Sequence, residues 1–198
     1  MKDRIIRILT DTGRNGMDQL IDYMDEGGYF EAPCSSGHHL AKLEGLAEHS
    51  LNVYETMISM DIGLGAELNY HSIAICALLH DLGKMGQYGK PYYVPNMLKG
   101  RATKTNPNPE PYQSDKKPYI TNSELLYVDH EVRSIAIASH FIELTEEEQQ
   151  AILWHNGLYG SFKYQIQGKE TPLYMLLHFA DMWASRVIEG KEGEADDE

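Results

Sequence analysis

A histidine–aspartate pair stands at the end of an apolar run in the middle of this chain. Residues 77–79 lead directly into His80 and Asp81, and Lys84 follows three residues later. Neighbouring helical residues point about 100° apart, so the pair cannot both lie deep in one apolar stripe. Both can converge on one ion if other helices bring further ligands. The chain offers further residues of these types, at His49, His130, His155 and Asp181.

Two of the expected helices carry an ionisable residue on their apolar face. His49 shares one helical face with a leucine, a valine and a methionine in a helix expected over 45–60. Asp181 shares one face with a leucine, an alanine and an isoleucine in a helix expected over 171–188. Carboxylates are rarely buried unless they are paired or bound to metal, and bundle cores are where helical metal sites are built. Any single histidine could be an ordinary core or surface residue, but the whole set favours a metal site.

The rest of the pattern is also helical, which predicts an all-α domain. Further helices are expected over 5–9, 17–24, 69–82, 123–140 and 145–155. No apolar run approaches the roughly 20 residues of a membrane helix. The N-terminal residues 1–4 are charged where a signal peptide is apolar. Cys34 and Cys76 are too few for a disulfide framework or a zinc–thiolate site. We therefore expect a cytoplasmic protein without membrane contact.

Charge is distributed unevenly. The net charge of −13 disfavours a protein that tracks long nucleic acids and favours a small phosphorylated substrate. Residues 84–117 nevertheless hold seven Lys and Arg against two acidic residues, whereas the tail 189–198 is acidic. Residues 85–122 are rich in Pro, Gly, Tyr and Lys, and so long a loop is typically a functional lid or disordered.

Tyrosines in this loop can stack on a base while lysines contact phosphate, although an ordinary solvated loop has the same composition. Lys84 is placed to contact a phosphate oxygen, or else it only interacts favourably with the dipole at the C-terminal end of its helix. The candidate substrate-binding residues are Lys84, His39, Tyr88, Lys90, Lys99 and Arg101.

Five short motifs together resemble those of the HD-domain metal-dependent phosphohydrolases. They are GLAEHS at 45–50, HDLGK at 80–84, HE at 130–131, WHNG at 154–157 and HFAD at 178–181. The resemblance is greatest to the HD domain of bacterial 3′-5′ exoribonucleases, from which the chain departs at Glu44, a glycine there, and at Asn156, a histidine there. It implies a single HD-domain helical bundle over 38–188, with a long loop insertion after the His-Asp motif. Short helices and a loop at 1–37 would precede it, and the acidic tail 189–198 would follow.

The resemblance also implies a ligand set. His49, His80, Asp81 and Asp181 would hold a first metal, and His130 and His155 a second one, with Asp81 bridging. His140 is an alternative to His130. Such ligands suit one or two divalent transition metals: Mn, Fe, Co, Ni or Zn.

The expected activity is hydrolysis of a phosphoester or phosphoanhydride in a nucleotide-like substrate by a metal-activated hydroxide, with Asp81 and Lys84 as catalytic residues. One alternative is a 3′-5′ exonuclease on short single-stranded RNA or DNA. The other is a non-catalytic, metal-holding nucleotide sensor. The sequence does not fix the oligomeric state.

Overall fold

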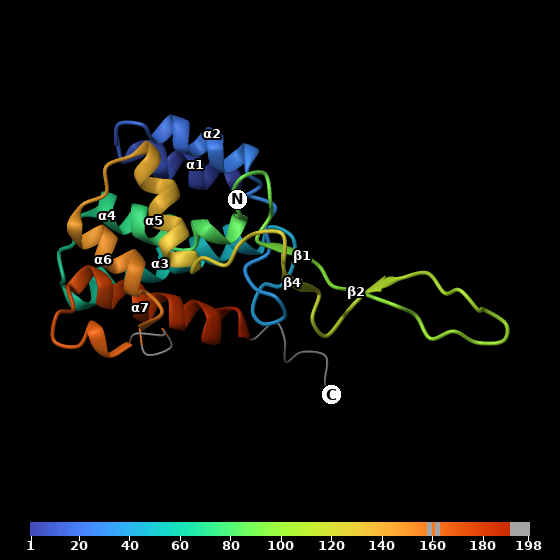
Figure 1. The fold of residues 1–198 in the computed structure, drawn as a ribbon. Coiled ribbons are helices and arrows are strands. Elements are labelled where there is room, and N and C mark those ends of the chain that lie inside the picture. Colours follow the sequence, from blue (N-terminus) through green and yellow to red (C-terminus); the bar gives the residue numbers. More distant parts are fainter. Residues whose placement is uncertain (158–159, 161–162, 191–198) are drawn as a thin grey trace.

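The computed structural model describes residues 1–157, 160 and 163–190, and these form a helical bundle from which one long arm extends (Figure 1). Helices and helical turns make up the body, so the expected all-α class is confirmed. Their bounds are α1 Lys2–Asp11, α2 Met17–Glu26, α3 Gly45–Leu64, α4 Tyr70–Leu79, η1 Leu82–Met85, α5 His130–Phe141, α6 Glu146–Trp154, η3 Lys163–Gln165, α7 Pro172–Trp183 and η4 Ala184–Ile188. Within the described ranges, no helix has both the length and the apolarity needed to cross a bilayer.

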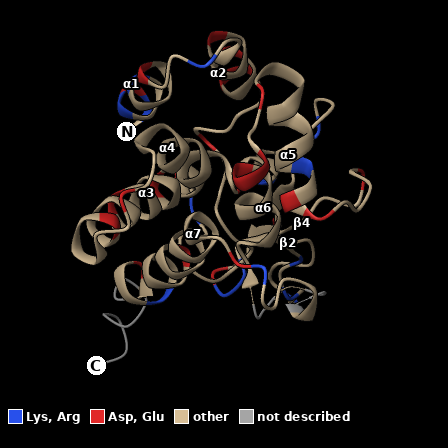
Figure 2. Ribbon diagram, turned by 90° about the vertical axis from the view of Figure 1, so that its left-hand side faces the viewer, with Lys and Arg blue, Asp and Glu red and all other residues tan. Residues whose placement is uncertain are grey.

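Helix α4 forms the centre of the bundle. It contains no charged residue, and in Figure 2 it is tan along its length, whereas α2 and α3 carry acidic positions. Every residue from Ile73 to Leu79 is buried. A helix that is apolar all round is stable only when other elements surround it, and burying each large side chain contributes about 1.5–3 kcal/mol. The end of α4 is therefore inside the protein, and so are the two residues that follow it.

The N-terminal helices α1 and α2 pack on the same core. Ile5, Leu9, Leu20 and Met24 are fully buried within it. Tyr29, which follows α2, donates from its hydroxyl to the carbonyl oxygen of Leu78 at 2.7 Å. Helix α1 packs against α4 and α3, and α2 packs against α1 and α5. The domain boundary at residue 37 stays a prediction.

The insertion forms an antiparallel arm, where the sequence predicted only a loop. Strand β1 (Tyr93–Pro95) pairs with β4 (Tyr119–Thr121), and β2 (Met97–Leu98) pairs with β3 (Tyr112–Gln113). The arm has two regions. Its foot, residues 114–119, contacts the loop before α3, and its tip, residues 99–110, extends away from the bundle (Figure 1).

Candidate metal centre

Asp81 lies at the centre of four imidazoles. It is 2% exposed and follows the last turn of α4, where the chain turns into η1. Its Oδ2 atom lies 3.7 Å from Nε2 of His49 and 3.4 Å from Nε2 of His80. Its Oδ1 atom lies 3.1 Å from Nε2 of His130 and 3.5 Å from Nε2 of His155. The two carboxylate oxygens therefore face two different pairs of histidines.

Asp181 completes the first of these two sets. It projects from α7 so that its Oδ1 atom lies 3.2 Å from Nε2 of His49, on α3. His49, His80 and Asp181 form one group whose ligand atoms all lie within 4.8 Å of one another, and His80, Asp81 and His155 form another. Helices α3, α5 and α7 and the C-terminal ends of α4 and α6 thus converge on a volume that can hold one or two ions.

Backbone carbonyls fix the orientation of two of the rings. Nδ1 of His80 lies 2.9 Å from the carbonyl oxygen of Ala77, and Nδ1 of His155 lies 2.8 Å from that of Ile152. Since a carbonyl only accepts, each Nδ1 carries the proton and donates it. The lone pair of each ring is then on Nε2, the atom that faces Asp81. A fixed tautomer of this kind is typical of metal-ligating histidines.

Glu189 orients the third ring, that of His49. Its Oε1 atom lies 3.0 Å from Nδ1 of His49 and accepts a second hydrogen bond at 3.0 Å from the side chain of Asn52. Sequence reasoning missed this residue, because Glu189 opens the acidic run at the C-terminus. It is only 5% exposed.

Three buried atoms in this centre have no hydrogen-bond partner among the described residues. They are Nε2 of His49, Nε2 of His80 and Oδ1 of Asp81. Leaving such an atom unsatisfied costs about 1–3 kcal/mol. The separations of 3.1–3.7 Å between the donor atoms are close to those of ligands bound about 2.1 Å from a shared ion. The residues present therefore fit divalent metal ions.

The charges of the centre also favour a cation. Burial opposes ionisation of Asp81, but Lys84 and His80 hold its pKa well below the usual range. Burial likewise opposes ionisation of Asp181, but the neighbouring imidazole of His49 lowers its pKa. For His80 burial dominates and lowers the pKa, which favours the neutral imidazole that a metal requires. Burial alone would lower the pKa of His49 and His155, but the acidic groups beside each ring raise both pKa values. The centre therefore attracts positive charge, and a bound metal ion would replace the protons on these two rings.

A cavity of about 280 Å³ opens onto the centre and gives a substrate access to it. Lys84, His155, Asp181 and Arg186 are among its lining residues. The Nζ atom of Lys84 lies 2.6 Å from Oδ2 of Asp81. Burial alone would lower the pKa of Lys84, but Asp81 reverses this effect and holds the pKa well above its ordinary value. A permanent cation therefore stands at the wall of the cavity.

His39 is the second substrate candidate beside the centre. Its Nε2 atom lies 3.9 Å from Oε2 of Glu189 and 3.5 Å from Sγ of Cys34, and its ring also lines the cavity. Burial and the neighbouring His49 lower the pKa of His39 to about 4, so this ring is neutral at ordinary pH.

The structure does not bring the other four substrate candidates to the metal centre. Tyr88 and Lys90 line a separate pocket of about 320 Å³ beside α2, and Lys99 and Arg101 are exposed at the arm's tip. Their part in substrate binding stays a prediction. His140, the alternative ligand, is exposed and packs against the ring of Phe141.

Two glycines permit the close approaches that the centre needs. A Cβ atom at Gly83 would lie 2.3 Å from the carbonyl oxygen of His130, and one at Gly157 would lie 2.4 Å from the ring of His178. His178 in turn faces the carbonyl oxygen of His155 with its Nδ1 atom at 2.7 Å. Both glycines therefore hold residues of the centre in place without contacting a ligand themselves.

Comparison with known proteins gives one match. A family model described as the HD domain matches residues 46–181, a span that contains all six candidate metal ligands. No curated protein matches the chain, and no solved structure does.

Proposed function

The chain belongs to the HD-domain family, whose members are generally metal-dependent hydrolases, and on this basis we propose that it cleaves a phosphoester or phosphoanhydride of a nucleotide-like substrate. The observation that carries the proposal is the position of Asp81, with one carboxylate oxygen toward each of two histidine pairs. A carboxylate so placed suits a bridge between two ions.

The six candidate ligands divide into two sets. His49, His80, Asp81 and Asp181 would hold one ion, and His130 and His155 would hold a second one with Asp81. Imidazole and carboxylate ligands suit Mn, Fe, Co, Ni or Zn. When bound, such ions lower the pKa of water and neutralise phosphoryl oxygens.

The residues around the ligands would position the substrate. Lys84 faces the cavity as a cation, so its ammonium group can contact a phosphoryl oxygen once the phosphate enters. Glu189 keeps Nε2 of His49 toward the centre by accepting from Nδ1. Because Asp81 and its four histidines are largely buried, water reaches the phosphate through the cavity rather than from all sides.

One observation favours a second candidate function, a 3′-5′ exonuclease on short single strands. The arm's tip carries exposed Lys99, Arg101 and Lys104 on a chain of net charge −13. Such residues can follow a phosphate backbone. The metal-holding sensor has less support, because a chain that had lost catalysis would be expected to have lost ligands, and all six candidate ligands are present.

The deciding experiment measures metal content and phosphate release together. Wild type, Asp81→Ala and a control, Asp22→Ala, are purified, supplied with Mn or Fe, and assayed on a panel of nucleotides and a short RNA. Asp22 is an exposed residue of α2 and serves as the matched carboxylate. We expect Asp81→Ala to lose both metal and turnover, and Asp22→Ala to lose neither. Wild-type protein that binds metal but turns over no substrate would support the sensor. Wild-type protein that binds no metal would contradict the proposal.

A further inference from the structure

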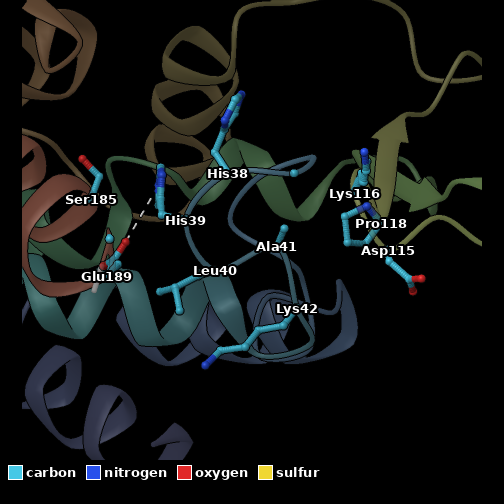
Figure 3. Close-up of a pocket in the computed structure, with 12 residues that line it drawn as sticks. His38, His39, Leu40, Ala41, Lys42, Asp115, Lys116, Pro118, Ser185 and Glu189 are labelled. Atoms are coloured by element: carbon cyan, nitrogen blue, oxygen red, sulfur yellow. Dashed lines mark ion pairs between the residues drawn. The ribbon is translucent and has the colours of Figure 1, made fainter. Parts of the chain in front are cut away.

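A second cavity, of about 480 Å³, adjoins the metal centre, and nothing described above gives it a role. We propose that it binds a nucleoside leaving group, so that the substrate is a nucleoside phosphoester whose phosphate lies at the metals. This inference rests on the proposed function and adds to it. The cavity has three walls, formed by residues 37–42, by the arm's foot at Asp115, Lys116 and Pro118, and by Ser185, Glu189 and Gly190 (Figure 3).

The two cavities share a boundary. His39 and Ser185 line both the larger cavity and the smaller one over the metal centre. In Figure 3 these two residues lie on one side of the larger cavity, and Lys116, Pro118 and Asp115 lie on the other. A molecule with its phosphate beside Lys84 would therefore extend past His39 toward the arm's foot. The volume of about 480 Å³ is in the range of small-molecule sites, about 300–1,000 Å³.

The loop wall is held in its shape by its own hydrogen bonds. The backbone N–H of Cys34 donates to the carbonyl oxygen of Leu40 at 3.1 Å, and the hydroxyl of Ser35 donates to that of His39 at 2.8 Å. A wall fixed before the ligand arrives loses little conformational entropy on binding.

The arm's foot is fixed to that loop. The backbone N–H of Tyr119 donates to the carbonyl oxygen of Ser36 at 3.0 Å. A Cβ atom at Gly37 would lie 3.1 Å from Cα of Lys117, so glycine lets the two backbones approach. The foot therefore faces the cavity in a defined position, and the insertion contributes one wall of the site.

The charges of the lining favour a neutral, polar ligand. Lys42 pairs with Glu48 at 3.0 Å, and Glu189 pairs with His49. Asp115 and Lys116 remain, and neither side chain has a hydrogen bond or ion pair with another described residue. A second phosphate would be attracted by Lys116 but repelled by Asp115. Sugar hydroxyls can instead donate to the Asp115 carboxylate, while Lys116 donates to acceptor atoms of a base.

Apolar atoms supply the rest of the lining. Leu40, Ala41 and Pro118 can contact the flat face of a base. In the reaction, water provides the oxygen of the new P–O bond, the bond from phosphorus to the nucleoside oxygen breaks, and that oxygen takes up a proton. The product left in this cavity is the free nucleoside.

The test compares two substrates and four variants. Nucleoside monophosphates have a leaving group that fills the cavity, whereas para-nitrophenyl phosphate has a smaller, apolar one. We expect Asp115→Asn and Lys116→Ala each to lower the kcat/KM ratio of nucleotide to para-nitrophenyl phosphate about tenfold, mainly through KM. Lys169→Ala and Glu110→Gln, which change exposed charges away from the cavity, are the matched controls and should leave the ratio unchanged. Equal losses on both substrates, or no loss, would overturn the proposal.

A binding measurement separates this inference from the proposed function. Adenosine, guanosine, cytidine and uridine are titrated into wild type and into Ala41→Trp, which would fill the cavity. We expect at least one nucleoside to bind wild type and to lose at least tenfold in affinity to the tryptophan variant, whose fold is checked by circular dichroism. Nucleoside binding without any turnover would defeat the proposed function alone. Turnover without nucleoside binding would defeat the subsite alone. The subsite would also be defeated if the variants lost activity only on substrates whose leaving group carries a second phosphate.

Discussion

The metal centre and the arm's tip are both rich in residues that can carry chemistry, but they differ in how those residues are held. In the centre, Asp81 and the histidines around it are largely buried and are fixed by carbonyls or carboxylates. At the tip, the side chains of Lys99, Arg101 and Lys104 are exposed and have no hydrogen bond or ion pair with another described residue. A cluster of charges in a sequence therefore becomes a built site only where folding buries and orients it.

Metal removal should have the largest effect of all, because activity and stability depend on the metal centre and not on the arm's tip. A chelator is expected to abolish turnover and to lower the melting temperature, because the buried carboxylates then lack their counter-charge. An ion present at a thousand times its Kd adds about 4 kcal/mol to the free energy of unfolding. The measurement is a pair of melting curves with and without chelator. The same curves for a variant with residues 99–110 replaced by a Gly-Ser linker should show an equal shift. A chelator shift that disappears with the tip would contradict the comparison.

Gly83→Ala tests how closely the centre is packed. The new Cβ would lie 2.3 Å from the carbonyl oxygen of His130, so η1 and α5 must separate. We expect a loss of about 3 kcal/mol in the free energy of unfolding, together with reduced activity as His130 moves from Asp81. Urea denaturation measures the first effect.

Gly63→Ala is the matched control for this substitution. Gly63 lies in α3, and a Cβ atom there would meet nothing within 4 Å. Alanine should leave stability unchanged or raise it by up to about 1 kcal/mol. If Gly83→Ala is as stable as Gly63→Ala, the close approach of η1 and α5 is incorrect.

Glu189→Gln examines the orientation of His49. The amide keeps the shape of the side chain but removes the negative charge opposite Nδ1. Metal affinity should fall about 10- to 100-fold, as is typical when the partner of a ligating histidine is changed. Titration of Mn²⁺ into metal-free protein gives the value, with Glu110→Gln at the arm's tip as the control. Equal Mn²⁺ affinity in the two variants would show that Glu189 does not contribute to metal binding.

The smallest effect is expected at the tip itself. The double variant Lys99→Ala, Arg101→Ala should change nucleotide hydrolysis by less than about twofold, because neither residue reaches the cavity at the metals. If the chain is an exonuclease, the same variant would weaken binding of a short RNA and reduce the salt slope by about two. Fluorescence anisotropy at several salt concentrations distinguishes the two results.

Helical periodicity was sufficient to predict most of the body. Apolar residues at helical spacing predicted the helices that carry His49 and Asp181, since amphipathic helices bury one face. Those two residues then stood out as ionisable groups on apolar faces. The structure places both in the centre, together with His80, Asp81, His130 and His155.

The strands of the arm could not be predicted in this way. They comprise only two or three residues each, and their pairs join residues as distant as Tyr93 and Thr121. A pattern of alternating residues cannot be recognised over so few positions. The contact between the foot and residues 36–37 is equally invisible in sequence, which is why Lys116 and Asp115 were not among the predicted substrate residues.

The sequence by itself predicted the bundle from local periodicity, and it marked His49 and Asp181 as metal ligands because burying an unpaired ionisable group is costly. The remaining ligands followed from the resemblance of its motifs to those of the HD-domain family. Only the tertiary structure decided what surrounds those ligands. Glu189 is the clearest case. It lies eight residues beyond Asp181, so a continuous α-helix would place it about 80° from Asp181 around the helix axis. The π-turn η4, closed by the bond from Glu189 N–H to the Ala184 carbonyl at 2.9 Å, absorbs one extra residue and returns Glu189 to within about 20° of Asp181. Local sequence does not specify such a turn, because its stability comes from the buried contacts of Glu189 with His49 and Asn52.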